Sequence, residues 1–268
     1  MPTKKLIFIL ICVFLAGPGL ASAKDITLYF APSWALQARK ARDISEALSK
    51  ESKLSIKPRI AKSYPQILDA FTRDEPVLVY VGSFVQAILK ARDLSVPIGQ
   101  GITGKHQYAS VLIAPEAAGS DPVEIVKNCG LKVAYAKGAS SGESGAQAAT
   151  GGQASLATNS HSASLNALKA GKAKCAFVKD HWWEDNGSKY PGMKMHKYPG
   201  VSDKQNPDFV LSANKAVGEN DIIRIKMATG KTASAFGVAT FRELSPDALS
   251  ASLELMRMGK IDPLKYTW

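Results

Sequence analysis

The segment 138–145 places glycines and serines directly after a predicted strand. Backbone N–H groups and hydroxyls beside a helix start are suited to surround an anion, and Ser140 and Ser141 supply the hydroxyls. Gly, Ser and Ala continue to Ala157, a composition that is also typical of a mobile, low-complexity loop. The residue types therefore indicate either an anion site or a mobile connection, and they leave both open.

The same turn matches the G-x-S-x-G pattern of a hydrolase nucleophile elbow through Gly138, Ser140 and Gly142. A triad in the usual hydrolase order needs an acid and then a His after this serine. The last His is His196, and no HGGG-like oxyanion segment occurs earlier in the chain. A secreted Ser hydrolase with Ser140 as its nucleophile is therefore the less favoured alternative, and we expect no enzyme.

Two further segments carry His residues that a site could use. His161 lies at a predicted helix start, where it can donate a hydrogen bond and the helix dipole adds positive potential. An ordinary surface His fits the sequence equally well. The run 180–185 holds metal-capable side chains, but adjacent residues rarely converge on one ion. We therefore expect no metal site and no cofactor.

Residues 1–23 have the parts of a secretory signal peptide. Two lysines precede an apolar run at 6–15, and small residues at 21–23 offer a cleavage site. The run is shorter than the roughly 20 residues that a membrane-spanning helix needs. We expect a mature protein of residues 24–268 that is periplasmic or secreted.

The composition is that of a globular protein, with 46% hydrophobic and 21% charged residues. The formal charge of +11 favours anionic partners, but the basic residues are spread along the chain and alternate with acids. Nucleic-acid binding would need a clustered basic stripe with aromatic platforms, so we do not expect it.

Two cysteines remain after the predicted processing, Cys129 and Cys175. An even pair in an exported protein indicates a disulfide, and each precedes an apolar run, so both could begin neighbouring strands. Two buried free thiols are the alternative.

Strands and helices alternate along the chain in two series. Strands are predicted at 26–30, 54–60 and 77–81 in the first series, and at 131–136 and 175–178 in the second. This pattern predicts an α/β protein of two lobes, each a mainly parallel sheet flanked by helices, with a ligand cleft between the lobes. Apolar segments near 108–114 and 208–212 are expected to cross between the lobes.

The order of these segments resembles the phosphate/phosphite/phosphonate-binding proteins of ABC importers. Residues 63–71 resemble that family's Y-x-x-x-I-x-A-L helix, and 77–87 its D-x-A-x-x-G-P-x-x-Y strand and turn. Residues 108–113 resemble its Y-x-S-V-L-V strand. The strongest likeness is between 160–178 and G-S-H-x-A-A-L-x-A-L-x-x-G-x-V-D-A-A-A-V.

The resemblance implies a type II periplasmic binding-protein fold and a set of ligand-binding residues. In the family, the anion is held by a Ser-rich turn, the Tyr of the first helix, the strand-end turn and the His. Carried over to this chain, the candidates are Tyr64, Gly82, Ser83, Ala139, Ser140, Ser141, Gly142 and His161.

The chain departs from the family pattern within these motifs. Ala139 replaces the first Ser of the turn, Glu143 replaces its Tyr, and Ser83 replaces a Pro. The carboxylate of Glu143 would repel a phosphonate oxyanion, although it could pair with an amine on the ligand.

The resemblance further implies an exported solute-binding protein that captures a phosphonate, phosphite or phosphate for an ABC permease. We expect a monomer with lobe one at 24–113 and 209–268 and lobe two at 114–208. Hinge closure is expected near 113–115 and 208–212. A ligand-sensing subunit of a membrane receptor is the alternative within binding proteins.

Overall fold

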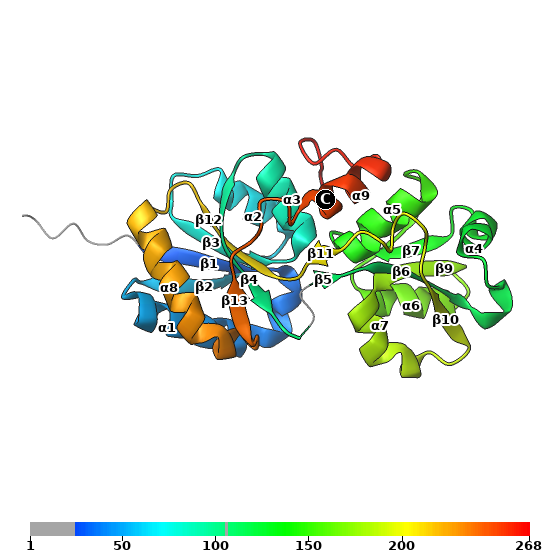
Figure 1. Ribbon diagram of the computed structural model, residues 1–268, viewed down its shortest axis with the longest axis horizontal. Helices are drawn as coiled ribbons and strands as arrows, with labels where there is room; N and C mark the ends of the chain where they lie inside the picture. Colours follow the sequence, from blue (N-terminus) through cyan, green and yellow to red (C-terminus); the bar gives the residue numbers. More distant parts are fainter. Residues whose placement is uncertain (1–24, 105–106) are drawn as a thin grey trace, which may run out of the picture.

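The computed structural model describes residues 25–104 and 107–268. Two α/β lobes lie side by side along the long axis of the molecule, each built on its own sheet (Figure 1). The predicted signal peptide lies outside the described residues. Within those residues, no helix has the length and apolar character that crossing a membrane requires.

The first lobe contains a six-stranded sheet in the order β13-β4-β12-β3-β1-β2. Its strands are β1 (Ile26–Phe30), β2 (Ile56–Ile60), β3 (Val77–Val81), β4 (Ser95–Ile102), β12 (Val210–Asn214) and β13 (Thr240–Arg242). Its helices are η1 (Pro32–Gln37), α1 (Ala38–Ser52), α2 (Tyr64–Phe71), α3 (Ser83–Ala91) and α8 (Glu219–Phe236). Every residue of β3 is buried, as its continuous apolar run predicts.

The second lobe contains a five-stranded sheet in the order β10-β6-β9-β7-β8. Its strands are β6 (Ser110–Pro115), β7 (Val133–Ala136), β8 (Leu156–Thr158), β9 (Cys175–Lys179) and β10 (Met193–His196). Its helices are η2 (Glu116–Ala118), α4 (Pro122–Cys129), η3 (Ser140–Ser144), α5 (Gly145–Thr150), α6 (His161–Lys169), α7 (Asp180–Asn186) and η4 (Gly187–Lys189). The side chains of Asp121 and Ser160 accept backbone N–H bonds at the starts of α4 and α6, which fixes both starts.

Both sheets are mixed, whereas the sequence pattern predicted mainly parallel ones. β1 pairs in parallel with β2 and β3, and β7 pairs in parallel with β8 and β9. In contrast, β12 runs antiparallel to β3 and β4, and β6 runs antiparallel to β9 and β10. These two strands follow the crossings, so each enters its sheet from the other lobe and runs in the opposite direction.

The chain crosses between the lobes at β5 (Gln107–Tyr108) and β11 (Asn206–Pro207), which pair with each other. The hinge predicted near 113–115 and 208–212 overlaps β6 and β12, which belong to the two sheets, and its position remains a prediction. Their apolar character reflects burial inside a sheet and does not mark a crossing. The lobe boundaries remain a prediction, and the strand pairing favours a first boundary nearer to β5.

A disulfide joins Cys129 and Cys175, whose Cα atoms lie 6.2 Å apart. This confirms the expected pairing, but only Cys175 begins a strand, since Cys129 ends α4. The bridge spans a sequence separation of 46 residues. By the loop-entropy argument it stabilises the second lobe by about 4 kcal/mol.

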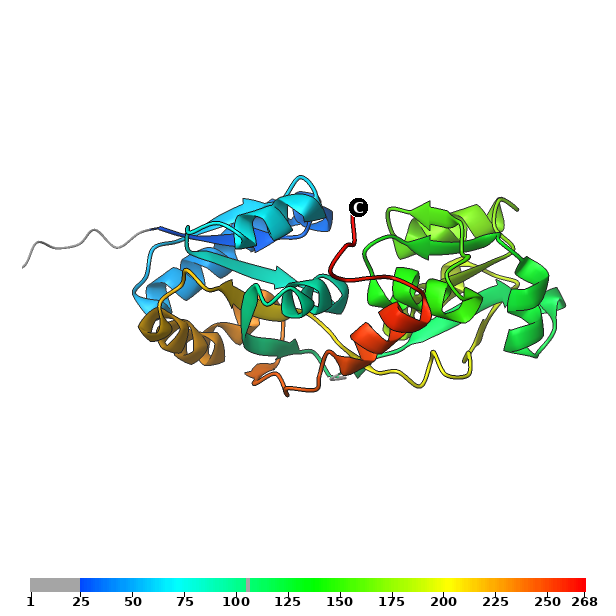
Figure 2. The same ribbon diagram turned by 90° about the horizontal axis from the view of Figure 1, so that it is seen from above.

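Helix α9 (Ser250–Met258) connects the hydrophobic cores of the two lobes. Leu255 packs in the core of the second lobe, and Met256 packs in the core of the first. The chain beyond α9 then runs between the lobes (Figures 1 and 2). This path brings the last residues of the sequence to the region where the lobes meet.

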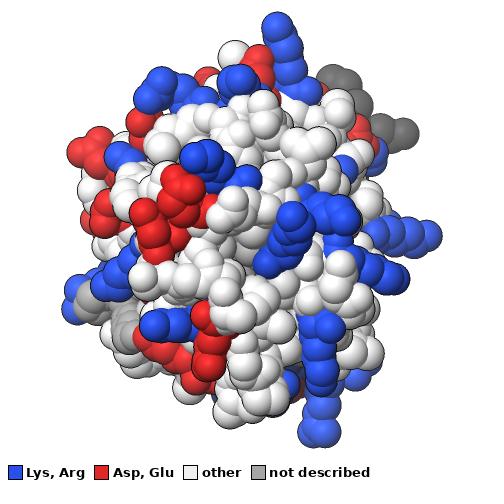
Figure 3. Space-filling view, turned by 90° about the vertical axis from the view of Figure 1, so that its right-hand side faces the viewer, with Lys and Arg blue, Asp and Glu red and all other residues white. Residues whose placement is uncertain are grey.

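The surface at the end of the second lobe carries both kinds of charge. Basic side chains on this face are separated by uncharged surface and by acidic groups (Figure 3).

Candidate functional site

The strand-end turn of the first lobe presents a buried hydroxyl to the second lobe. Gly82 caps the start of α3, and Ser83 is the first residue of that helix. The Ser83 hydroxyl lies 2.5 Å from the hydroxyl of Tyr108 and donates to Ser140 Oγ at 3.0 Å. Three hydroxyls, from α3, β5 and η3, therefore converge where the lobes meet.

The turn of the second lobe is ordered and closely packed, so the mobile-loop interpretation is wrong. It begins at Gly138, whose φ of +74° lies in the left-handed region that favours glycine. The carbonyl of Ala139 accepts the N–H of Gly142 at 3.1 Å. One π-helical turn, η3, follows, and such turns are frequent at functional sites.

Contacts with the neighbouring strands hold this turn in place. The Ser110 hydroxyl donates to the carbonyl of Ser141 at 2.7 Å. A Cβ atom on Gly142 would lie only 2.7 Å from the carbonyl oxygen of Ala136 and 2.8 Å from its nitrogen. Glycine is therefore required where the turn crosses the end of β7.

His161 begins α6, the helix start that the sequence predicted, and its side chain faces this turn. Its Nε2 lies 3.4 Å from Ser141 Oγ, and its Nδ1 is buried without a hydrogen-bond partner among the described residues. Burial, with a further contribution from the charge of Lys179, lowers the pKa of His161 to about 4. The imidazole is therefore neutral at pH 7 and offers one N–H donor.

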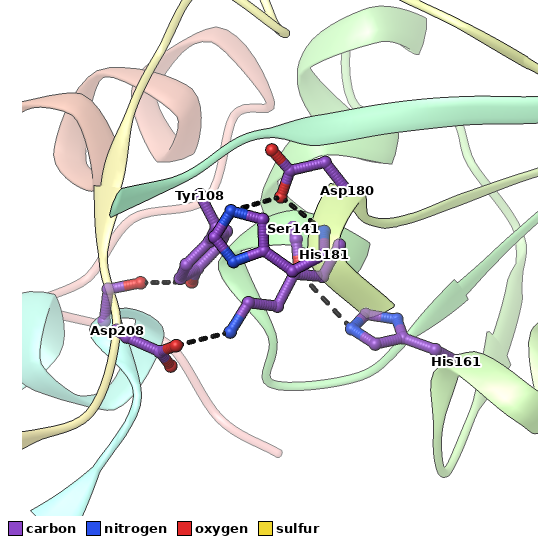
Figure 4. A network of polar contacts seen from close by, with 8 residues as sticks. Tyr108, Ser141, His161, Asp180, His181 and Asp208 are labelled. Atoms are coloured by element: carbon purple, nitrogen blue, oxygen red, sulfur yellow. Dashed lines mark hydrogen bonds and ion pairs between the residues drawn. The ribbon is translucent and has the colours of Figure 1, made fainter. Parts of the chain in front are cut away.

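A cation and two carboxylates that sequence reasoning did not select complete the polar cluster (Figure 4). Lys179 Nζ lies 2.7 Å from Asp208 Oδ2 and 4.5 Å from the ring centroid of Tyr108. Asp180 accepts the backbone N–H of His181 at 2.8 Å. Lys179 is the last residue of β9, so the rule that ligands bind beyond strand ends could have identified it.

Glu143 is buried, with 5% of its surface exposed, and its carboxylate accepts hydrogen bonds from other residues of the protein. It accepts the N–H of Gly138 at 2.6 Å and the hydroxyl of Tyr266 at 2.8 and 2.9 Å. Burial raises the pKa of Glu143, although these two hydrogen bonds oppose the shift. The partner Tyr266 gave no signal in the sequence.

The structure brings together four of the predicted site residues. Ser83, Ser140, Ser141 and His161 contribute the side chains described above, while Gly82, Ala139 and Gly142 shape the backbone of the two turns. Tyr64 lies beside this group, where its ring stacks on Trp268 at a centroid distance of 4.6 Å.

The arrangement is rich in hydroxyl donors and does not form a nucleophile with its base at Ser140. Ser140 Oγ accepts from Ser83, and the imidazole of His161 lies beside Ser141. Within residues 25–104 and 107–268, no cluster of His, Cys, Asp and Glu could hold a metal ion. Hydroxyls, backbone amides and an imidazole are groups that can donate hydrogen bonds to an anion.

A model of the family described as "ABC transporter, phosphonate, periplasmic substrate-binding protein" matches residues 35–229, more than half of the chain. The chain belongs to this family. It is therefore a periplasmic substrate-binding protein of the phosphonate ABC-transporter family, which confirms the resemblance found in the sequence. No curated protein matches the sequence.

Solved structures of periplasmic binding proteins share the fold. PhnD1 from Prochlorococcus marinus (MIT 9301), in complex with methylphosphonate, aligns with a TM-score of 0.69 at 16% identity, over 90% of this chain and 100% of that one. A binding protein component of an ABC phosphonate transporter from Pseudomonas aeruginosa gives 0.66 at 14% identity, over 88% and 87%. XAC2383 from Xanthomonas citri, bound to ATP, gives 0.69 at 12% identity, over 89% and 98%. These relatives confirm the two-lobed type II fold of this phosphonate-family member.

Proposed function

We propose that this protein captures a phosphonate, or the related phosphite or phosphate, between its lobes and delivers it to the permease of an ABC importer. The meeting of hydroxyls from both lobes at Ser83, Tyr108 and Ser140 is the observation that supports this most directly. An anion held there would join the lobes, because its oxygens can accept hydrogen bonds from each of them.

The donors suit a partly protonated oxyanion. A hydroxyl can both donate and accept, so Ser83, Ser140 and Ser141 can pair with a P–O⁻ or a P–OH group. His161 adds an N–H without a full charge, and the nearby Lys179 adds positive potential. Binding by these groups needs no covalent step, so we propose transport without catalysis.

The other parts of the proposal concern location and partners. A signal peptide at residues 1–23 would direct the chain to the periplasm, where the family acts. There the protein would act as a monomer and present its ligand to the permease.

Thermal unfolding of residues 24–268 tests the ligand class. The ligands are methylphosphonate, aminoethylphosphonate, phosphite, phosphate and sulfate. A ligand at 100 times its Kd stabilises a protein by roughly 2.7 kcal/mol. For a chain of this size, Tm should rise by about 5 to 10 °C. A rise with a phosphorus anion but not with sulfate is expected, whereas no rise with any phosphorus anion would contradict the proposal.

Alanine variants test the site itself. Ser83→Ala and Ser140→Ala each remove one hydroxyl from the junction and should weaken binding by about 1 to 3 kcal/mol. Ser162→Ala is the matched control, because Ser162 is exposed one residue beyond His161. Calorimetric titration gives the Kd values. Unchanged affinity in both site variants would show that the ligand does not bind at this junction.

A further inference from the structure

The segment Tyr266–Trp268, here called the cleft segment, lies where the two lobes meet (Figure 2). Its approach is fixed by Arg92 of the first lobe. The guanidinium of Arg92 donates to the carbonyls of Pro263 and Tyr266, each at 2.9 Å. The cleft segment is therefore held against the first lobe by its backbone.

Tyr266 also contacts both turns of the candidate site. Its hydroxyl donates to the buried carboxylate of Glu143 in the second lobe at 2.8 and 2.9 Å. Its ring packs edge-on against Phe84, the residue after Ser83, with centroids 5.1 Å apart. The cleft segment thus bridges the lobes beside the converging hydroxyls.

Trp268 packs against neighbours of the same donors. Its indole stacks on Tyr64 at 4.6 Å and lies 5.4 Å from the ring of Phe84. A Cβ atom on Gly138 would lie 2.6 Å from Cζ3 of Trp268. The indole therefore occupies space between the first lobe and the start of the turn that carries Ser140.

The indole N–H of Trp268 is buried and has no hydrogen-bond partner among the described residues. A buried donor without a partner is destabilising, so native proteins rarely keep one without a reason. A ligand oxygen beside Trp268 would satisfy it. This donor is an observation independent of the packing, and it is free to bond an oxygen atom of a ligand next to the indole.

A groove of about 930 Å³ lies along the cleft segment. It is lined by residues of α2, including Gln66, by Arg92, and by all three residues of the cleft segment. Because Trp268 borders this groove and also contacts Gly138, its side chain stands between the groove and the turn of the second lobe.

We propose that Trp268 sets the size of the group that the ligand carries on phosphorus, and that its indole N–H donates to the ligand. This inference rests on the proposed function. A compact substituent, such as H or methyl, fits beside the indole, whereas a bulky one would collide with it. Without the indole, a bulky substituent can extend toward the groove.

Calorimetric titration of four proteins with phosphite, methylphosphonate and phenylphosphonate tests this inference. Trp268→Ala removes the indole that stands between the groove and the turn of the second lobe. Trp268→Phe keeps an aromatic ring but removes the N–H. Trp183→Ala is the matched control, because Trp183 is also partly buried and also stacks on a tyrosine, Tyr190. Far-UV circular dichroism of each variant verifies folding.

The wild type should bind methylphosphonate at least about tenfold more tightly than phenylphosphonate. Trp268→Ala should reduce that ratio by about tenfold or more, and Trp183→Ala should preserve it. Trp268→Phe should still reject phenylphosphonate but bind methylphosphonate about 3- to 10-fold more weakly, since it lacks the donor.

Several results would overturn the inference while leaving the proposed function intact. They are equal affinity of the wild type for the methyl and phenyl ligands, an unchanged ratio in Trp268→Ala, and undiminished methylphosphonate affinity in Trp268→Phe. Binding by Trp268→Ala alone would also overturn it, because the indole would then block binding instead of selecting ligands. If no phosphorus ligand binds any of the four proteins, the proposed function fails, and this inference fails with it.

Discussion

Two strand-to-helix turns meet at the candidate site, and different contacts hold them in place. The turn after β3 is local and regular. Gly82 has a φ of −72°, and a Cβ atom there would meet nothing within 4 Å. Ser83 then begins an ordinary α-helix. The position of this hydroxyl follows from the strand and the helix that flank it.

The turn after β7 depends on close packing against its own strand and on a residue far away in the chain. Gly142 packs directly against the backbone of β7, and Glu143 bonds to Tyr266 at a sequence separation of 123 residues. The comparison shows that one half of the site is set by local geometry, while the other half is set by tertiary contacts. Substitutions at equivalent places in the two turns should therefore have unequal effects.

The largest difference is expected between Gly142→Ala and Gly82→Ala. A methyl group at Gly142 meets the backbone of Ala136, which cannot move without disturbing β7, so we expect a loss of about 1 to 3 kcal/mol or more of unfolding free energy. At Gly82 the only cost is that of Ala at an N-cap, below about 1 kcal/mol. Urea denaturation measures both, and equal losses would mean that the two turns are held alike.

The local turn and its surroundings are the part that the sequence predicts well. The strands 26–30 and 77–81 have the expected bounds, and Ile67, Leu68 and Phe71 face inward from α2. These elements combine a clear apolar pattern with a turn or a proline at their ends, so local preference and tertiary structure agree.

Elements stabilised by their neighbours were missed or shortened. β4 contains Pro97, Gly99 and Gly101, and it has no strand-like alternation. A Cβ atom on Gly101 would lie 2.8 Å from the hydroxyl of Tyr80. Packing therefore requires a glycine at this position, although glycine has a low intrinsic preference for strands. The sequence has a clear apolar helical pattern only near 221–227, yet α8 continues to Phe236, where Thr232 and Phe236 remain buried.

The candidate site shows the same division between residues that the sequence predicts and residues that only the fold brings together. Its hydroxyls and His161 lie in motifs, so the sequence could nominate them. Asp208 and Trp268 reach the site only through the fold, because the second crossing and the chain beyond α9 converge there. A single sequence carries no signal for such convergence.

Glu143→Gln tests the contact between the turn after β7 and Tyr266, and we expect an intermediate change in unfolding free energy. The pKa of Glu143 is raised in the folded protein, so its contribution to stability is present below the unfolded value of 4.5 and is lost as pH rises through the folded pKa. The amide keeps the size of the side chain and an acceptor for Tyr266 without this dependence. Glu143→Gln should therefore gain stability relative to the wild type as pH rises above 4.5.

Urea denaturation at several pH values measures this gain, and Glu116→Gln, which removes an exposed carboxylate, is the control. The same variant should bind methylphosphonate more tightly at pH 8, because a buried negative charge beside the turn is removed. A stability difference that stays constant with pH would show that desolvation of Glu143 does not govern this turn.

A further pH-dependent effect is expected from the titration of His161. The native pKa of about 4 lies below the ordinary value of 6.5, so the unfolded chain binds a proton that the native protein does not. Stability should therefore fall as pH decreases from 6.5 to 4, and His161→Gln should remove this part of the slope. A bound oxyanion favours the charged imidazole, so methylphosphonate should raise the pKa of His161 in an NMR titration. If saturating methylphosphonate left that pKa unchanged, the ligand would not contact His161, and the imidazole would serve only to position Ser141.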